Sequence, residues 1–555
     1  MKKDKTVFKF NILAVVLIII FCVSITPITL QNDTYYTISI GEHILKNGID
    51  MHDPFSWHNI PYTYPHWGYD VLIYIIYSWF GMVGIYIATC FLSSILGLAI
   101  YGVNCKLAKN HVISFLITMI SMFLLKDYIA ARAQLVTFIL FILTIYCIEM
   151  FLETKKKYYA ASLVIISIII ANVHVAVWPF YFILFMPYLG EYIFSVVADT
   201  IIEKKYTKYI LKKRIEKLSK KPGNEEKIAK MQIKLSKLNI KVEAIKTKRK
   251  ESKKNPYKIK INKNKTTRWL IVILIICVLT GLLTPLGDTP YTYLAKTMQG
   301  NTTKNINEHL PMTIIEHEYV FCLLIAYIAL LTFTTAKIEL KDLLMICGLA
   351  YLMLASRRQV TMFVLIGSVV INRMMLEAIE TNLKKDVEKI VIKKMTTKTC
   401  ICIISALVLG ISLHFIDVKK DDQIVDEKSY PVAACDYILK NIDINKAKFY
   451  NDYNYGSYML YRGIPVFIDS RADLYAPEFN TPTGKVEDGK DIFMDFMNVS
   501  SIATYYDTVF DNYQMTHVIT TKYSKLAMLI NNRNDKKYKE LYSDNYFIIY
   551  AIDRT

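Results

Sequence analysis

Side chains that could act in acid–base chemistry lie in one polar segment near the N-terminus, residues 31–81. Asp33 follows the first long apolar run, Asp53 begins the sequence Asp-Pro-Phe-Ser-Trp that ends at Trp57, and Trp67 follows. A carboxylate at a membrane surface can take a proton from an attacking hydroxyl or amide group, and indole rings can cover the apolar face of a substrate. Asp33 and Asp53 are therefore candidate catalytic residues, and Trp57 and Trp67 are candidate substrate-binding residues.

Both aspartates also have a structural interpretation that the sequence leaves open. Asp is favoured at the N-terminus of a helix, and the residues from Thr34 to about Lys46 have the pattern of an amphipathic helix that stops at Asn47-Gly48. Asp33 would cap that helix in this alternative. Asp53 precedes a proline, a context that is typical of a turn.

Three arginines are candidates for binding a phosphate group. Arg357 and Arg358 stand between two apolar runs, and Arg132 lies in a short connection that also holds Lys126 and Asp127. The planar guanidinium forms paired, charge-assisted hydrogen bonds with phosphate oxygens, and charges at membrane depth cost free energy unless they meet a partner. The alternatives are contact with lipid headgroups and, for Arg132, neutralisation by Asp127.

Four further residues are candidates for substrate binding. Asn172 and His174 lie between two apolar runs, where polar groups need partners. Asp469 and Arg471 follow a strand-like apolar segment, a place where binding loops are common, although an internal Asp–Arg pair explains them equally well. Neutral imidazoles could also bind a divalent metal. The histidines show no HExxH-type spacing, so the sequence assigns no cofactor and leaves a divalent metal open.

The elements that must position these residues are membrane helices. Of the 555 residues, 53% are hydrophobic, and the positive mean hydropathy of +0.28 excludes a disordered chain and an ordinary soluble domain. A membrane-spanning helix needs about 20 apolar residues. We therefore expect an all-α polytopic membrane domain of about eleven transmembrane helices, over residues 8–30, 82–103, 111–126, 134–152, 158–174, 176–196, 269–285, 318–336, 341–356, 359–376 and 399–416.

The excess positive charge belongs to one insertion. The chain has a formal net charge of +19, and residues 203–268 contain 25 Lys and Arg but 6 Glu, so the remainder carries 42 charges of each sign. After Pro222-Gly223, apolar residues recur at a 3-4-3-4-3 spacing from Ile228 to Ile245, which predicts a helical hairpin with a coiled-coil seam. No nucleic-acid partner is predicted because aromatic residues do not interleave the lysines.

The basic connections set the predicted orientation. They fall between alternate spans, at residues 1–5, 104–110, 153–157, 203–268 and 373–398. By the positive-inside rule these face the cytoplasm, which places the N-terminus inside the plasma (inner) membrane and the C-terminus outside it. The predicted domains are residues 1–202 (first part of the membrane domain, with the outer loop 31–81), 203–268 (cytoplasmic hairpin), 269–416 (second part) and 417–555 (an extracytoplasmic α/β domain).

Two sets of motifs resemble those of a known superfamily. The first loop has the pattern Asp33, Gly41, Ile44, Gly48, Asp53-Pro-Phe-Ser-Trp57 and Trp67, and the tail has Asn451-Asp-Tyr-Asn-Tyr-Gly-Ser-Tyr458 and Phe467-Ile-Asp-Ser-Arg471. Together with many spans and an outer tail, this resembles the GT-C superfamily of membrane glycosyltransferases, in particular a group of largely uncharacterised bacterial members. The D-x-D metal motif of the oligosaccharyltransferases in that superfamily is absent here.

The resemblance implies a function and a set of partners. We expect transfer of a sugar from a polyprenyl-phosphate donor to a glycan, lipid or protein acceptor of the cell envelope, with membrane lipids around the enzyme. In this reading Asp33 is the base, and Arg357 and Arg358 hold the donor phosphate. The alternative is a non-catalytic membrane component, either a lipid-saccharide transporter or an assembly and binding partner, because a fold resemblance does not establish catalysis.

Overall fold

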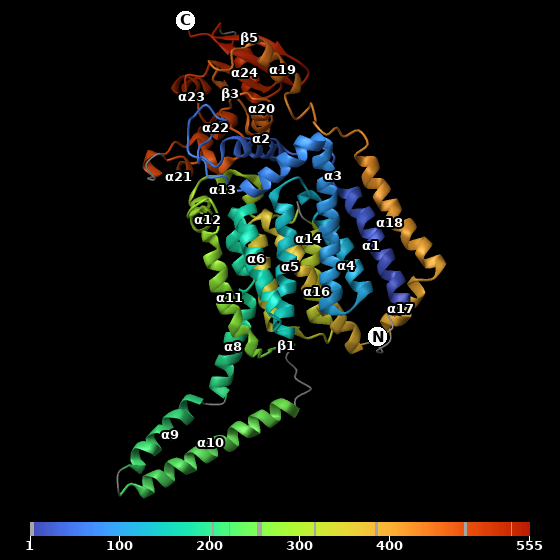
Figure 1. Ribbon diagram of the computed structural model, residues 1–555, viewed down its shortest axis with the longest axis vertical. Coiled ribbons are helices and arrows are strands. Elements are labelled where there is room, and N and C mark those ends of the chain that lie inside the picture. The colour runs from blue at the N-terminus through green and yellow to red at the C-terminus, as the bar shows by residue number, and fades with distance from the viewer. Residues whose placement is uncertain are drawn as a thin grey trace.

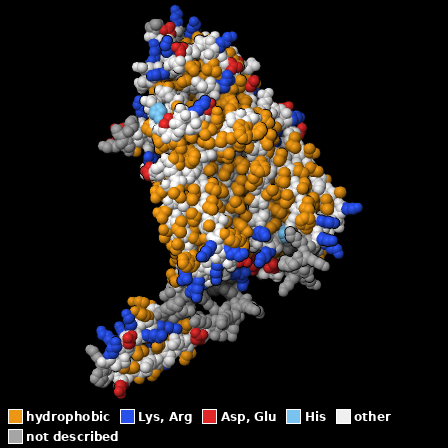
Figure 2. Space-filling model, viewed as in Figure 1, with side chains coloured by type: hydrophobic (Ala, Val, Ile, Leu, Met, Phe, Trp, Pro, Cys, Tyr) orange, Lys and Arg blue, Asp and Glu red, His pale blue; other side chains and the backbone are white. Residues whose placement is uncertain are grey.

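The computed structural model describes residues 5–202, 205–220, 223–251, 258–315, 318–382, 387–481, 486–533 and 536–554. A bundle of helices forms its centre, a mixed α/β tail covers one end of the bundle, and a two-helix hairpin projects from the other end (Figure 1). The surface of the bundle is a broad apolar band, with Lys and Arg gathered at the end nearer the hairpin (Figure 2). The chain is therefore a mostly helical, multi-pass membrane protein.

Helices occupy all eleven apolar stretches predicted from the sequence. Among the described residues, seven segments are long and apolar enough to cross a bilayer: α1 (Lys5–Ile25), α3 (Trp67–Ala108), α5 (Ala133–Thr154), Val175–Val197 with α7 (Trp178–Ile183) and α8 (Met186–Ile202), Lys265–Leu282 with α11 (Arg268–Leu279), Arg357–Thr381 with α16 (Val360–Asn382), and α18 (Lys398–Val418). Four are shorter: α4 (His111–Leu124), α6 (Lys157–Val173), α14 (Glu318–Phe333) and α15 (Leu340–Ala355).

The first outer loop contains the predicted amphipathic helix. This helix, α2, runs from Asn32 to Asn47 and ends where Gly48 takes a positive φ of 82°, a conformation that glycine adopts without strain. Close packing of α2 on the first part of α3 depends on Gly41, because a Cβ at that position would lie 2.2 Å from the carbonyl oxygen of Asp70. Gly81, with a non-helical φ of 62° and ψ of −159°, divides α3 into a short first part that ends at Phe80 and a long part that begins at Met82.

The tail contains a four-stranded sheet in the order β3–β4–β6–β5. β3 (Phe449–Tyr450) runs parallel to β4 (His517–Thr521), while β6 (Phe547–Ile552) is antiparallel to both β4 and β5 (Tyr538–Ser543). Its helices are α19 (Val432–Asn441), α20 (Tyr453–Tyr461), α21 (Pro477–Asn480), α22 (Ile492–Ser501), α23 (Tyr506–Asn512) and α24 (Lys525–Asn532). Because residues of the first loop and the tail share one apolar core, the loop is held between the bundle and the tail.

Aromatic packing fixes α2 against the tail. The ring of Tyr35, on α2, lies 4.9 Å from that of Tyr430 and 5.0 Å from that of Tyr458, both edge to face. Such pairs contribute about 0.5–1.5 kcal/mol beyond the area they bury. Asn32 adds a hydrogen bond of 2.8 Å from its side-chain amide to the carbonyl oxygen of Tyr453. The start of α2, with Asp33, is thus held at the junction of bundle and tail.

The hairpin consists of α9 (Lys205–Ser219) and α10 (Glu225–Glu251). Leu211 and Val242 are buried between the two helices, as the predicted seam requires, whereas Pro222 of the predicted turn lies outside the described residues. After the hairpin, β1 (Ile259–Lys260) pairs in parallel with β2 (Ile338–Glu339). The remaining short helices are α12 (Thr289–Gln299), α13 (Thr302–Asn305) and α17 (Val387–Met395).

Candidate functional site

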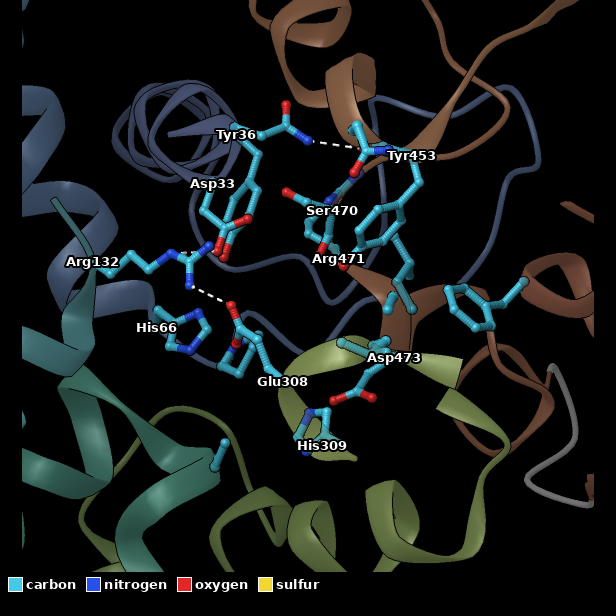
Figure 3. Close-up of a pocket in the computed structure, with 18 of the residues that line it drawn as sticks. Asp33, Tyr36, His66, Arg132, Glu308, His309, Tyr453, Ser470, Arg471 and Asp473 are labelled. Carbon is cyan, nitrogen blue, oxygen red and sulfur yellow. Dashed lines mark hydrogen bonds and ion pairs between the residues drawn. The ribbon is translucent and has the colours of Figure 1, made fainter. Parts of the chain in front are cut away.

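A cavity of about 600 Å³ lies where the tail meets the bundle. Its walls come from the start of α2, the residue before α5, the segment between α13 and α14, the 3-10 turn Arg357–Gln359, and the tail around α20 and residues 470–474. Segments that lie far apart in the sequence therefore converge on one space (Figure 3). Five of the predicted site residues line it: Asp33, Arg132, His174, Arg358 and Arg471.

A chain of charges crosses the cavity. Arg132 lies between two carboxylates, with Nε 2.9 Å from Oδ2 of Asp33 and Nη1 donating to Oε1 of Glu308 at 3.2 Å (Figure 3). Burial disfavours the charged guanidinium, but the two carboxylates outweigh burial and raise the pKa of Arg132. Burial alone would raise the pKa of Glu308, but Arg132 and Arg358 lower it below its usual range. Arg132 and Glu308 therefore stay charged at neutral pH.

The structure tests the capping interpretation of Asp33. The N-cap position of α2 belongs to Gln31, and Asp33 lies in the first turn of the helix. The capping alternative is therefore wrong. The carboxylate of Asp33 instead faces Arg132 across the cavity wall, and its side chain is 21% exposed, so a molecule in the cavity can reach it.

The two adjacent arginines have different surroundings. Arg358 lines the cavity, and in the described part of the chain its guanidinium forms no hydrogen bond or ion pair. Arg357 is not among the lining residues, and its guanidinium donates to the carbonyl oxygen of Pro311 at 3.3 Å and to Oδ1 of Asn307 at 3.0 Å. Of the predicted pair, Arg358 alone is thus placed to meet a ligand in this cavity.

Three imidazoles border the same cavity and are neutral near pH 7. Burial, reinforced by the positive charges of Arg358 and Arg132, lowers the pKa of His66 from 6.5 to about 3. Burial also lowers the pKa of His174 well below its usual value, and that of His309 in the same direction. The His66 and His174 rings lie 4.9 Å apart, and Nδ1 of His174 is 3.0 Å from the hydroxyl of Thr137. Uncharged rings of this kind can hydrogen-bond a neutral polar substrate.

The tail provides the opposite wall. Tyr453 donates from its hydroxyl to the carbonyl oxygen of Ser470 at 3.1 Å, and both residues line the cavity. Asp473 accepts three hydroxyl hydrogen bonds, from Tyr293 at 2.9 Å, Thr297 at 3.1 Å and Thr302 at 3.2 Å. These bonds fix the segment around α12 and α13 to the tail, so the wall is rigid on that side.

Asp53, Asp469 and Arg471 form a buried ion cluster. Arg471 donates from Nη1 to Asp53 at 2.7 Å and from Nη2 to Asp469 at 2.6 Å, and both carboxylates are fully buried. Burial would raise the pKa of Asp53, but Arg471 and the Ser56 hydrogen bonds lower it. Neither aspartate lines the cavity. The cluster holds the first loop to the tail, so we leave Asp53 and Asp469 out of the proposed chemistry.

A second, apolar hollow of about 580 Å³ lies next to the cavity. It is lined by Trp67, Ile168, Ile169, Asn172, Val173, Leu283, Thr284 and Pro285. Trp67 donates from Nε1 to the side-chain oxygen of Asn172 at 3.2 Å, while the Asn172 amide donates to the carbonyl oxygens of Ile168 and Leu283. Trp67 and Asn172 thus border this hollow and not the charged cavity, although their neighbours His66 and His174 line the latter.

Trp57 is not at either hollow. Its indole N–H donates to the carbonyl oxygen of Phe449 at 3.2 Å, and its ring stacks on Phe467 at 5.7 Å. Both partners belong to the tail. Trp57 therefore anchors the first loop and does not face the cavity.

The sequence predictions did not include several residues that line the cavity. Glu308, Asp473 and His66 are the most important of these, and Glu308 is separated from its partner Arg132 by 176 positions. A Glu-His pair in a long polar connection was the signal for Glu308, but nothing local indicates which cation it meets. His66 stands beside Trp67, and its ring contact with His174, 108 positions later, exists only in the folded chain.

The part of the chain that the structure describes contains no preformed metal site. Among those residues, no group of three or more His, Cys, Asp or Glu side chains is arranged to hold a metal ion. The polar groups of the cavity instead alternate in charge, with Arg132 and Arg358 between acids and neutral imidazoles.

No protein-family model and no curated protein sequence matches this chain.

Proposed function

We propose that this protein transfers a sugar from a polyprenyl-phosphate donor to an acceptor of the cell envelope. The observation that carries the proposal is that Asp33 and Arg358, a carboxylate and a cation from opposite halves of the membrane domain, line one cavity. A base for the acceptor and a cation for the leaving phosphate are the two groups that such a transfer needs. This arrangement suits the GT-C superfamily that the first loop and the tail resemble.

The proposed reaction is a displacement at the anomeric carbon of the donor sugar. Asp33 takes the proton of the acceptor hydroxyl or amide as the acceptor forms its bond to that carbon. The bond between the anomeric carbon and the phosphate oxygen breaks, and its electron pair leaves with the polyprenyl phosphate. Arg358 stabilises the phosphate charge, with Arg132 as a second cation, while the neutral His66 and His174 hydrogen-bond sugar hydroxyl groups.

The apolar hollow supports a lipid-linked donor. It is lined mostly by aliphatic groups of α6 and the segment after α11, and it adjoins the charged cavity through the consecutive pairs His66-Trp67 and Val173-His174. A polyprenyl chain in the hollow would place its phosphate at the cavity. Burial of each CH₂ group of such a chain contributes about 0.8 kcal/mol.

A membrane orientation completes the proposal. We infer eleven spans, with the N-terminus and the hairpin in the cytoplasm and the tail outside the plasma membrane, since the basic connections gather at the hairpin end (Figure 2). The cavity would then open at the outer leaflet, where envelope glycans, lipids and proteins are the available acceptors.

Replacement of Asp33 by Asn tests the proposal. We expect Asp33→Asn to lose at least 100-fold in transfer from a panel of radiolabelled polyprenyl-phosphate hexoses to an envelope extract, because the amide is not a base. Glu42→Gln is the matched control, since Glu42 is an exposed acid on the same helix that pairs with Lys46. Donor binding and folding should be preserved in both variants.

Full transfer activity in Asp33→Asn would exclude Asp33 as the base. If wild type showed no transfer with any donor but bound lipid-linked saccharides, the alternative of a non-catalytic transporter or assembly partner would replace the proposal. A loss of folding in Asp33→Asn alone would assign the Asp33–Arg132 contact a structural role.

A further inference from the structure

The surface of α10 carries a stripe of lysines whose side chains remain exposed in the described chain. Five lysines recur at a 3-4-3-4 spacing, at positions 227, 230, 234, 237 and 241, which places them along one side of a helix with 3.6 residues per turn. All five are exposed. One of them, Lys230, pairs with Glu226, but this exposed pair contributes little attraction.

An apolar ridge borders this stripe. Ile233 and Ile240 are seven positions apart, so they lie on one face of α10, and their side chains are 54% and 69% exposed. The residues that pack against α9, such as Leu235 and Val242, lie on the opposite face. The isoleucines are therefore not part of the seam, and they leave an exposed apolar strip beside the lysines.

The other flank of the ridge is different. Between positions 228 and 245 it holds Gln232, Ser236, Asn239 and Glu243, with no lysine among them, and lysines appear on this flank only near the end of the helix, at positions 246 and 250. Over the stretch from 228 to 245 the lysines of α10 are thus concentrated on one side of the apolar ridge. This one-sided combination of lysines and aliphatic groups is the pattern of a helix that lies in the interface of a bilayer with anionic lipids.

The placement of the hairpin fits this partner. α9 follows α8, a helix of the membrane bundle, and β1 returns the chain to the bundle, so both ends of the hairpin are tethered at the membrane surface. α10 runs across the direction of the bundle helices and not along it (Figure 1), and its 27 residues extend for about 40 Å. A helix of that length and direction can lie along the leaflet at the hairpin end of the bundle.

We propose that the lysine stripe and the Ile233–Ile240 ridge of α10 form a binding surface for the anionic phospholipids of the protein's own membrane. Lysine ammonium groups contact the lipid phosphates, and the two isoleucines enter the region between headgroups and acyl chains. The inference is independent of the proposed transferase activity.

Hydrogen exchange of the full-length protein in lipid nanodiscs tests this surface. We expect the α10 amides to exchange more slowly in discs of phosphatidylcholine and phosphatidylglycerol than in pure phosphatidylcholine, and to lose the difference in 0.5 M salt. Neutralising one lysine of the stripe should weaken attachment about fivefold. Lys234→Gln/Lys237→Gln/Lys241→Gln should therefore abolish the slowing, and Ile233→Ser/Ile240→Ser should reduce it.

The matched control removes the same charge from α9. Lys212→Gln/Lys213→Gln/Lys217→Gln replaces three exposed lysines of the same hairpin but leaves the α10 stripe intact, so most of the slowing should remain. Equal exchange in both lipid mixtures would overturn the proposal. An equal loss in the α9 and α10 variants would overturn the oriented surface, and slowing by an added acidic polypeptide or RNA but not by anionic lipid would replace the lipid with that partner.

Discussion

Nε of Arg132 lies 2.9 Å from Oδ2 of Asp33, and this contact joins the first turn of α2 to the residue that precedes α5. The Nε–H group finds no hydrogen-bond acceptor among the described residues, so the contact is an ion pair without hydrogen-bond geometry. The contact keeps the carboxylate of Asp33 at the cavity wall, where the proposed reaction needs a base.

Arg357 and Arg358 are adjacent in the sequence, so replacing each in turn tests which of them binds the donor phosphate. Arg358→Ala should reduce transfer by 100-fold or more, since Arg358 faces the cavity and has no partner in the described chain that would keep it there for structural reasons. Arg357→Ala should leave the rate within about threefold of wild type but lower the melting temperature, because Arg357 bonds Pro311 and Asn307. Steady-state rates and thermal unfolding of both variants decide this, and the reverse order of rates would contradict the assignment.

The buried Asp53–Arg471 pair should be important for stability. Asp53→Asn leaves a buried guanidinium with one carboxylate partner, so we expect a loss of about 3–5 kcal/mol in the free energy of unfolding. Asp436→Asn is the comparison, because the Asp436 side chain is 64% exposed and a solvent-exposed carboxylate of this kind contributes about 1 kcal/mol or less through its ion pair. Urea or thermal unfolding measures both, and similar losses in the two variants would argue against the buried cluster as the attachment of the first loop.

His66 predicts a pH dependence of stability. Its pKa falls from 6.5 to about 3 on folding, so the unfolded chain binds a proton that the folded chain does not as the pH drops below 6.5. The contribution of neutral His66 to the free energy of unfolding is thus fully present above pH 6.5. It is lost progressively as the pH falls toward 3, by up to about 1.4 kcal/mol per pH unit. His66→Gln removes this slope. Melting temperatures from pH 7.5 to 4.5 should fall less steeply for the variant, and parallel curves would contradict the burial of His66.

The contact of α2 with α3 limits what residue 41 can be. A Cβ at Gly41 would lie 2.2 Å from a backbone oxygen and 2.6 Å from Cβ of Tyr74, so Gly41→Ala must move α2 and with it Asp33. We expect a destabilisation of about 1–3 kcal/mol and reduced transfer. Gly102→Ala, in the partner helix α3 and with open space around it, should be neutral in both measurements. Equal activity in the two variants would show that the position of α2 does not matter for transfer.

The apolar hollow predicts a dependence on donor chain length. Ile169→Trp should fill the hollow and raise the KM for a long-chain polyprenyl donor, with little change for a water-soluble short-chain analogue. Ile165→Trp is the control, because Ile165 lies one turn earlier on α6, is exposed, and is not a lining residue. A shift in KM that is the same for both donors, or for both variants, would place the lipid chain elsewhere.

The location of the helices could be predicted because the relevant signals are local. Apolar runs, the 3-4 spacing of the hairpin and the Asn47-Gly48 stop each lie within a short stretch of sequence, and helices occupy those stretches. The candidate site was predicted in part. Asp33, Arg132 and Arg358 share a cavity, but Arg357 faces away and Trp57 anchors the loop, since the direction of a side chain depends on what packs against it.

The sequence by itself determined a helical membrane protein with one basic insertion and a polar tail, because hydrophobic periodicity and charge are local properties of the amino-acid sequence. The tertiary structure alone decided which charges meet. Arg132 pairs with Glu308 across 176 positions, and Arg471 pairs with Asp53 across 418. Such contacts depend on how α2, the bundle and the tail pack together, and no local pattern encodes that packing.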